Sequence, residues 1–150
     1  MLGLGAAWNG SEHEAYGLDF PPVAERMDRL EEAVQVCRAM FEGDRVTFEG
    51  SHYRTHDARN VPRPLQPGGP RILIGGGGER RTLRLVARYA DACNLHGEPE
   101  RIRRKLEVLH RHCAELGRDP ATVAVTRLSG SASASTLSAR ARTCSLVRSS

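Results

Sequence analysis

The chain has 150 residues, about the length of one ordinary domain, and 39% of them are hydrophobic, which is enough for a buried core. No apolar run approaches the ~18–20 residues that cross a bilayer, and the N-terminus lacks the basic region of a signal peptide. The formal net charge of +4 does not indicate nucleic-acid binding, because Arg140, Arg142 and Arg148 near the C-terminus supply three of these charges. The four cysteines show neither CxxC nor zinc-ligand spacing, so we expect reduced thiols, no metal site and a cytoplasmic location.

The first part of the chain predicts a strand, a loop and a long helix. Residues 1–6 are expected to end a buried strand, and the polar residues 9–22 to form a loop. From Val23 to Phe41 apolar side chains recur at every third or fourth position, which predicts a helix with one buried face. Gly43 is expected to end that helix.

A short hairpin and an extended connector are predicted next. Residues 45–54 alternate apolar and polar side chains around a glycine, which indicates a hairpin in which Phe48 and Tyr53 pack. Residues 60–70 carry four prolines and two glycines and predict an extended connector.

The following segment alternates predicted strands and helices. Strands are expected at residues 71–74, 92–95 and 122–126, and helices at residues 79–90 and 99–116. Connections this short imply parallel strands joined by right-handed crossovers. The sequence therefore predicts an α/β fold.

The tail at residues 129–150 has a different composition. Eight of its 22 residues are serine, none is acidic, and no helical or strand period remains. We expect a disordered low-complexity tail, of the kind that a frameshift or a premature end produces. A closed (β/α)8 barrel takes roughly 250 residues, so the chain is also expected to be part of a larger protein.

Four successive glycines, Gly75, Gly76, Gly77 and Gly78, lie between a predicted strand and a predicted helix. Their backbone N–H groups are open to an anion, and the following helix adds the positive end of its dipole. The alternative is a tight turn or a flexible linker, which the strand–helix setting disfavours. Because no Gly-Lys-Ser/Thr follows, the loop is not a Walker A motif, and we predict that it binds a cofactor phosphate without transferring it.

Other polar residues allow two interpretations each. Arg80 and Arg81 follow the glycines and either pair with a phosphate or are surface charges of the helix. Glu12, His13 and Glu14 are candidates for acid–base work, but adjacent polar residues in a loop are usually solvated.

Two histidine pairs are expected at the surface. His52 and His56 flank the hairpin without ligand spacing, and His110 with His112 falls on a charged helix face.

The segment that ends at Trp8 begins like the dinucleotide-binding pattern GxGxxG. Trp8 occupies the position of the third glycine, however, and a loop follows where a helix is needed, so a Rossmann site is disfavoured. Trp8 follows the carboxyl end of a predicted strand, which is the ligand-binding edge of a parallel α/β fold. Its ring is expected either to flank a planar cofactor or to pack under the long loop.

Several motifs together resemble the luciferase-like monooxygenase family, and within it the branch that uses the deazaflavin coenzyme F420. They are GxGxxW at residues 3–8, EAYGxxFPPxxERxxxLEE at 14–32, FEGxxY at 48–53, IGGGG at 74–78 and RYADACNL at 88–95. The resemblance covers residues 1–128, and the joint match is much more specific than any single glycine pattern.

The resemblance implies a partial (β/α)8 TIM barrel, its C-terminal half, with a helical and hairpin insertion. In this family a flavin or deazaflavin lies across the carboxyl ends of the strands, and its phosphate rests in the loop that matches Gly75–Gly78. Gly5, Ala6, Ala7 and Trp8 would lie near the cofactor. Ala7 stands where the family more often has glycine, and it adds a methyl group near the ring.

The function that this resemblance implies is F420-dependent hydride transfer to or from a small-molecule organic substrate, in a parent protein that is a candidate homodimer. An FMN-dependent monooxygenase of the same fold and a non-enzymatic phosphate-ligand or partner-binding remnant remain as alternatives. No catalytic acid or base is predicted, and no nucleic acid or membrane is expected as a partner. Because the N-terminal barrel half is missing, the chain alone is expected neither to fold stably nor to turn over substrate.

Overall fold

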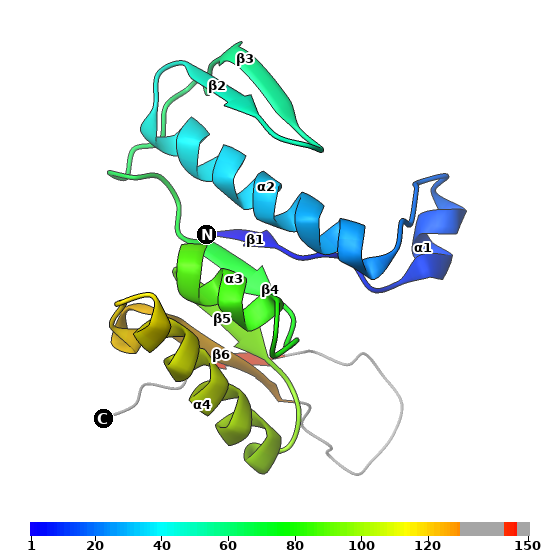
Figure 1. Cartoon of the computed structure of the whole chain (residues 1–150), viewed down its shortest axis with the longest axis vertical. Coiled ribbons are helices and arrows are strands. Elements are labelled where there is room, and N and C mark those ends of the chain that lie inside the picture. The colour runs from blue at the N-terminus through cyan, green and yellow to red at the C-terminus, as the bar shows by residue number, and fades with distance from the viewer. Residues whose placement is uncertain (130–142, 147–150) are drawn as a thin grey trace. The chain divides into compact units, whose positions relative to one another are not determined.

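The computed structural model describes residues 1–129 and 143–146 of the chain. The chain divides into two compact units, Met1–Ile72 and Leu73–Ser150, and each unit has its own architecture (Figure 1). The elements of the first unit are β1 (Leu2–Leu4), α1 (Gly10–Ala15), α2 (Val23–Glu42), β2 (Val46–Glu49) and β3 (Arg54–Ala58).

Helix α2 is the scaffold of the first unit, and its predicted buried face is confirmed. Met27, Leu30 and Val34 repeat at helical spacing and are at most 6% exposed, whereas Val23 in the first turn is 63% exposed. The helix ends at Gly43, whose N–H donates to the carbonyl of Ala39.

The hairpin is confirmed as a two-stranded antiparallel sheet. Val46 pairs with Ala58 and Phe48 with Thr55, with a bulge between the two pairs. Phe48 is half-buried, but Tyr53 is 41% exposed, so the expected packing of Tyr53 is only partial. Leu2, in β1, donates its N–H to the carbonyl of Arg71 at 2.8 Å and so ties the start of the chain to the end of the connector.

The loop predicted at residues 9–22 contains a helix, which corrects the prediction. Gly10–Ala15 forms α1, and the side chain of Asn9 accepts a hydrogen bond from the Glu12 N–H at 3.3 Å. Asn9 is therefore an N-cap. No residue of α1 is buried, so this short helix has no apolar period from which it can be predicted.

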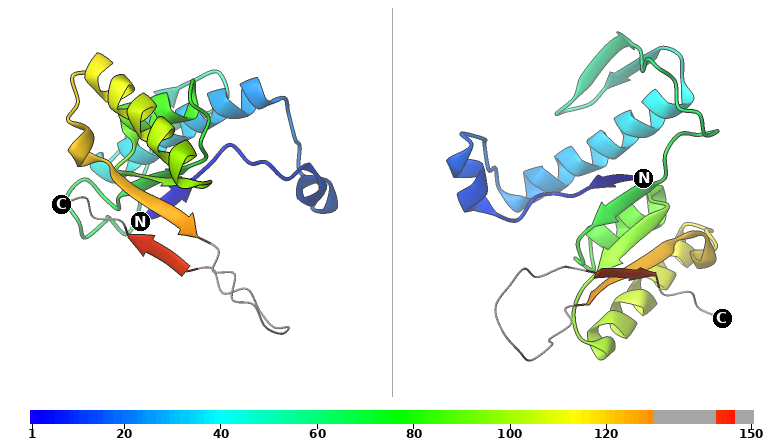
Figure 2. Two further views of the ribbon diagram at one scale, coloured as in Figure 1. Left: turned by 90° about the horizontal axis from the view of Figure 1, so that it is seen from below. Right: turned by 180° about the vertical axis from the view of Figure 1, so that it is seen from behind.

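The second unit is an α/β layer. It contains β4 (Ile72–Gly75, which begins at the last residue of the first unit), α3 (Thr82–Tyr89), β5 (Ala92–Leu95), α4 (Pro99–Glu115), a 3-10 turn at Pro120–Thr122, β6 (Ala124–Ser129) and β7 (Thr143–Leu146). The four strands lie in the order β4-β5-β6-β7 (Figure 2). The β4–β5 and β5–β6 pairs are parallel, as predicted, and β6–β7 is antiparallel.

Strand β6 begins two residues later than predicted. Asp119 accepts the Ala121 N–H on its side chain at 2.9 Å and so starts the 3-10 turn that precedes the strand. Helix α3 likewise begins at Thr82 and not at Glu79, because the chain first completes the glycine loop.

The core of the second unit lies between the sheet and helices α3 and α4. The largest fully buried side chains of the unit belong to both layers: Ile74, Leu83, Val86, Cys93, Leu95, Leu109 and Cys113. Arg118 caps the C-terminus of α3. Its guanidinium donates hydrogen bonds to the carbonyls of Val86, Ala87 and Ala90.

Most of the predicted disordered tail lies outside the described residues. Within residues 129–150, the structure describes Ser129 as the end of β6 and Thr143–Leu146 as β7, a strand that the composition does not predict. Across the described part of the chain, no helix is both long and apolar enough to cross a membrane.

Candidate functional site

The four glycines form the turn between β4 and α3, as predicted. Gly75 is the last residue of β4, and the Leu83 N–H in the first turn of α3 donates back to the Gly78 carbonyl at 3.0 Å. Gly76 has φ of +112°, a conformation that only glycine adopts without strain. The strand therefore turns sharply at this point, and Glu79, Arg80 and Arg81 form a turn that leads from the glycines to the first residue of α3.

At Gly77 and Gly78, glycine is favoured because neighbouring atoms lie close to the position of a Cβ atom. A Cβ on Gly77 would lie 2.1 Å from Nζ of Lys105, and one on Gly78 would lie 2.9 Å from Oγ1 of Thr82. The loop is thus packed by α4 at Gly77 and by the start of α3 at Gly78, so a side chain at either position would have to displace its neighbour.

Lys105 is the residue that sequence reasoning missed. It lies on α4, is only 5% exposed, and donates from Nζ to the Gly77 carbonyl at 2.7 Å. Burial lowers its pKa, the nearby Arg101 lowers it further, and Glu79 opposes both effects. One signal was available in the sequence, because Lys105 is the single lysine among 22 Lys and Arg residues.

His112 corrects the expectation that both histidines of α4 lie at the surface. Its side chain is 15% exposed, and Nε2 lies 2.9 Å from the Glu79 carbonyl. Since a carbonyl only accepts, Nε2 carries a proton. His110 is exposed, as predicted.

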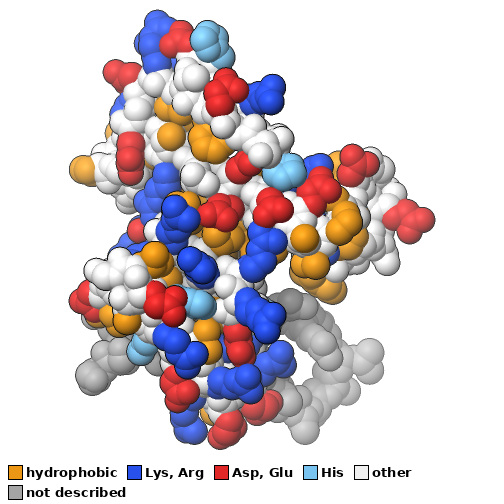
Figure 3. All heavy atoms as spheres, viewed as in Figure 1, with side chains coloured by type: hydrophobic (Ala, Val, Ile, Leu, Met, Phe, Trp, Pro, Cys, Tyr) orange, Lys and Arg blue, Asp and Glu red, His pale blue; other side chains and the backbone are white. Residues whose placement is uncertain are grey.

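The surroundings of the glycine loop are rich in positive charge. Arg80 and Arg81 are both exposed, and Arg81 occupies the N-cap of α3 without a side-chain capping bond. Arg104 lies 3.4 Å from the carboxylate of Glu79. Basic side chains gather over α3 and α4, with acidic ones among them (Figure 3). Open backbone donors at a helix N-terminus in such a field suit an anion.

The first unit contains a separate cavity of about 320 Å³ beside α2. We call it the α2 cavity. Three of the predicted cofactor residues, Gly5, Ala6 and Ala7, line it, whereas Trp8 is 87% exposed. The other lining residues come from β1, α1, the following loop, α2 and the hairpin: Leu4, His13, Asp19, Pro21, Arg26, Arg29, Leu30, Ala33 and Tyr53.

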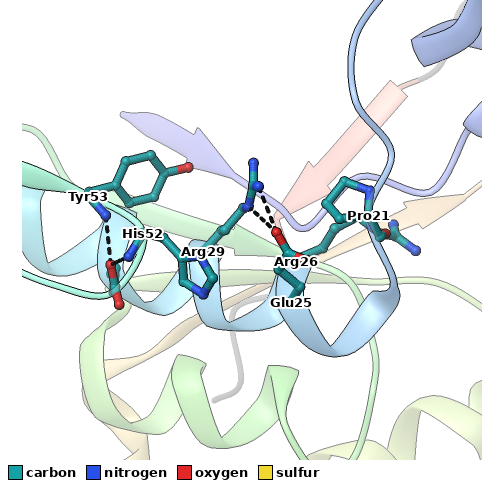
Figure 4. Close-up of polar contacts among 7 residues, drawn as sticks. Pro21, Glu25, Arg26, Arg29, His52 and Tyr53 are labelled. Carbon is teal, nitrogen blue, oxygen red and sulfur yellow. Dashed lines mark hydrogen bonds and ion pairs between the residues drawn. The ribbon is translucent and has the colours of Figure 1, made fainter.

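Arg26 fixes one wall of the α2 cavity. Its Nη1 donates to the carbonyls of Ala6 and Ala7 at 3.0 and 2.7 Å, and its Nε donates to the Pro21 carbonyl at 2.9 Å. Its guanidinium also lies 3.9 Å from the ring centre of Phe20. Figure 4 shows Arg26 beside Pro21 and next to the Arg29–Glu25 ion pair of α2.

Ala7 has a left-handed backbone, with φ of +59°. This conformation favours glycine over alanine. The departure noted in the sequence is therefore a source of local strain.

Of the three acid–base candidates Glu12, His13 and Glu14, only His13 lines the α2 cavity. Its Nδ1 lies 2.9 Å from the Asn9 carbonyl, and its ring centre is 4.8 Å from that of Phe20. Glu12 and Glu14 are exposed on α1. These contacts give His13 a structural partner and assign it no catalytic role.

Glu32 fastens the hairpin turn to α2. Its carboxylate accepts the backbone N–H groups of Ser51, His52 and Tyr53 at 2.8–2.9 Å, and the last two are shown in Figure 4. Desolvation raises the pKa of this carboxyl, but the three N–H donors and the nearby charge of His52 together outweigh it, so the pKa is lowered overall.

The lowered pKa predicts a pH dependence of the hairpin turn. Because the folded pKa lies below that of the unfolded chain, this contribution to stability is complete above the unfolded pKa and is lost as the pH falls through the folded pKa. We expect the amide resonances of Ser51, His52 and Tyr53 to shift together on acidification, and Glu32→Gln to abolish this step. A step that survives in Glu32→Gln would contradict the assignment.

No metal or thiolate chemistry is indicated among the residues described. They contain no group of three or more His, Cys, Asp or Glu side chains that could hold a metal ion. Burial and the neighbouring Cys113 raise the pKa of Cys93 to about 11, so this thiol stays protonated at neutral pH.

The predicted cofactor residues thus form two separate groups, one in each unit. Gly75–Gly78 lie in the second unit with Lys105 and His112, and Gly5–Ala7 lie in the first unit with Arg26. Each group is built by its own unit.

Parallel strands joined by helices, with a glycine loop at the carboxyl end of β4, are the repeating unit of parallel α/β folds such as the (β/α)8 barrel. The profile of the luciferase-like monooxygenase family matches residues 1–144. The chain belongs to this family, and the predicted fold class is confirmed.

Known relatives include F420-dependent enzymes. The F420-dependent glucose-6-phosphate dehydrogenase of Intrasporangium calvum is 43% identical over 89 residues, which are 59% of this chain and 25% of that protein. The F420-dependent hydroxymycolic acid dehydrogenase of Mycobacterium tuberculosis is 30% identical over 82% of this chain and 33% of its own length. A solved F420-dependent secondary alcohol dehydrogenase, in complex with an F420-acetone adduct, superposes with a TM-score of 0.71 at 25% identity, over 82% of this chain and 37% of that one. The chain therefore spans about a quarter to a third of the two dehydrogenases matched by sequence.

Proposed function

We propose that this chain is the phosphate-binding part of an F420-dependent oxidoreductase that moves a hydride between the coenzyme and a small organic substrate. The observation that carries the proposal is the glycine loop, with its open backbone at the start of α3 and a buried lysine behind it. The F420 dependence of the relatives named above supports the choice of cofactor.

The residues present fit a cofactor phosphate. Gly76 has a backbone conformation that requires glycine, and Gly77 and Gly78 have close neighbours at their Cβ positions, so a ligand meets backbone N–H groups directly. Arg80 and Arg81 are exposed beside the loop, where their charge favours an anion. The acid that follows the glycines in the chain, Glu79, has its carboxylate 3.4 Å from the guanidinium of Arg104.

The deazaflavin, when bound, supplies the hydride chemistry. The residues of this chain hold and orient it. Gly75–Gly78 bind its phosphate, and Gly5–Trp8 are proposed to lie near its ring system, in a conformation fixed by Arg26. No side chain among the described residues is assigned as the catalytic acid or base.

We also propose that the chain alone turns over no substrate, because it spans only a quarter to a third of its F420-dependent relatives. Homodimer formation, a small organic substrate and a cytoplasmic location are part of the same proposal. The free thiols of Cys37, Cys93 and Cys113 accord with a reducing compartment.

The proposal is tested with a chimera in which residues 1–128 replace the matching segment of the Intrasporangium calvum enzyme. We expect the chimera to bind F420 more tightly than FMN, by fluorescence titration, and the 150-residue chain to show no turnover with either. Tighter FMN binding with oxygen consumption would favour a monooxygenase. A chimera that binds inorganic phosphate but neither F420 nor FMN would favour a non-enzymatic remnant.

A further inference from the structure

Helix α4 contacts the glycine loop through two backbone carbonyl groups. Lys105 donates to the Gly77 carbonyl, and His112, two turns further along the helix, donates to the Glu79 carbonyl. Both bonds are longer-range contacts, spanning 28 and 33 residues. The side of the loop that faces α4 is therefore the side that presents carbonyl oxygens.

The geometry of the peptide bond sets where the N–H groups point. In a trans peptide unit the C=O and N–H bonds point in opposite directions, and the loop lies apart from the cis bond of the described chain, at Val61–Pro62. With the Gly77 carbonyl turned toward Lys105, the Gly78 N–H is turned away from α4. The same holds for the Arg80 N–H, because the Glu79 carbonyl faces His112. Gly78 and Arg80 are both exposed.

Lys105 and Gly77 are matched in size. Nζ of Lys105 occupies the place where a side chain of residue 77 would begin, 2.1 Å from the ideal Cβ position. A compact ammonium group suits this narrow space, whereas a planar guanidinium with five N–H donors needs more acceptors and more room. This explains why a chain that otherwise uses arginine has its one lysine here.

We propose that Lys105 is a positioning residue of the glycine loop, which binds the Gly77 carbonyl and thereby holds the Gly78 N–H toward the phosphate group of a ligand. The inference rests on the proposed phosphate-binding role of the loop and adds the residue that sets its donor geometry. The buried ammonium also attracts the anion through the loop, at a position where solvent screens it little.

The test compares three forms of the 150-residue chain in a titration with inorganic phosphate, followed by backbone amide resonances whose dispersion first shows that the chain is folded. In the wild type we expect the Gly78 and Arg80 amides to shift selectively. Lys105→Met keeps most of the side-chain stem but removes the donor and the charge, and it should weaken phosphate binding about tenfold or more. Arg103→Met is the matched control. Arg103 is an exposed cation of α4 that lies 3.7 Å from Glu100, and its loss should change the affinity less than about twofold.

The outcomes separate the two proposals. Without selective phosphate shifts in the wild type, the phosphate role of the loop fails. With such shifts but equal affinities in wild type and Lys105→Met, the role of Lys105 fails and that of the loop stands.

A measurement on the wild type covers the case in which Lys105→Met does not fold. Because the chain has a single lysine, its Nζ gives one side-chain ammonium resonance. We expect the carbonyl carbon of Gly77 to shift as this group titrates, and phosphate to raise the pKa of Lys105. An Nζ that titrates like free lysine, without any response at Gly77, overturns the inference.

Discussion

Replacing Arg26 with methionine is expected to free the Gly5–Trp8 segment from α2 and to destabilise the first unit by about 2–4 kcal/mol. The guanidinium donates to the carbonyls of Ala6, Ala7 and Pro21, and these bonds join both ends of the loop that contains α1 to the start of α2. Methionine retains the apolar stem but offers no donor, so all three carbonyl groups lose a partner.

The strain at Ala7 adds a structural change to the loss of stability. A left-handed alanine costs about 1–2 kcal/mol and persists only where neighbouring contacts hold it. The bond from Arg26 to the Ala7 carbonyl is such a contact. Once it is removed, Ala7 is expected to relax to a negative φ, which moves the following Trp8.

Thermal unfolding and Trp8 fluorescence check this prediction, since Trp8 is the only tryptophan of the chain. Arg29→Met is the control one turn away. Arg29 pairs with Glu25 at the surface, at 2.6 Å, and its removal should cost less than about 1 kcal/mol. Equal losses in the two variants would show that the bonds to the segment carry no special stability. Adding Ala7→Gly to Arg26→Met should return the Trp8 fluorescence toward that of the wild type, because glycine keeps the left-handed turn without strain.

Elements whose signal is local could be predicted from the sequence. The repeat of Met27, Leu30 and Val34 identifies α2, and Gly43 marks its end. The alternation around Gly50 identifies the hairpin, and the short strand–helix spacing identifies the parallel pairs of the second unit. In each case the period of the apolar residues matches the geometry of one element.

Features that depend on contacts between distant segments could not be predicted in this way. The helix at Gly10–Ala15 depends on a cap from Asn9 and buries nothing. Lys105 and His112 look like members of a charged helix face, and only the fold places them against carbonyls 28 and 33 residues away. The glycine loop was visible because its own residues carry the signal, whereas the side chains that orient it lie on another element.

The partnership of Gly77 and Lys105 predicts that Gly77→Ala weakens phosphate binding about tenfold, nearly as much as Lys105→Met. The new methyl group would lie 2.1 Å from Nζ, and the flexible end of the lysine moves more easily than the backbone. The backbone of Gly77 does not have a positive φ, so alanine introduces no conformational strain there. The substitution therefore acts by displacing the ammonium group from the Gly77 carbonyl.

A double-mutant cycle identifies this cause. The Lys105→Met variant lacks the Nζ atom that collides with the new methyl group, and the preceding carbon of Lys105, Cε, lies 3.3 Å from that Cβ position. Adding Gly77→Ala to Lys105→Met should therefore weaken phosphate binding little further, and the two losses should not add. Gly76→Ala is the contrasting control. Its φ of +112° makes alanine strained whatever occupies position 105, so its loss should add in full to that of Lys105→Met. Additive losses for Gly77→Ala would mean that residue 77 acts on the phosphate independently of Lys105.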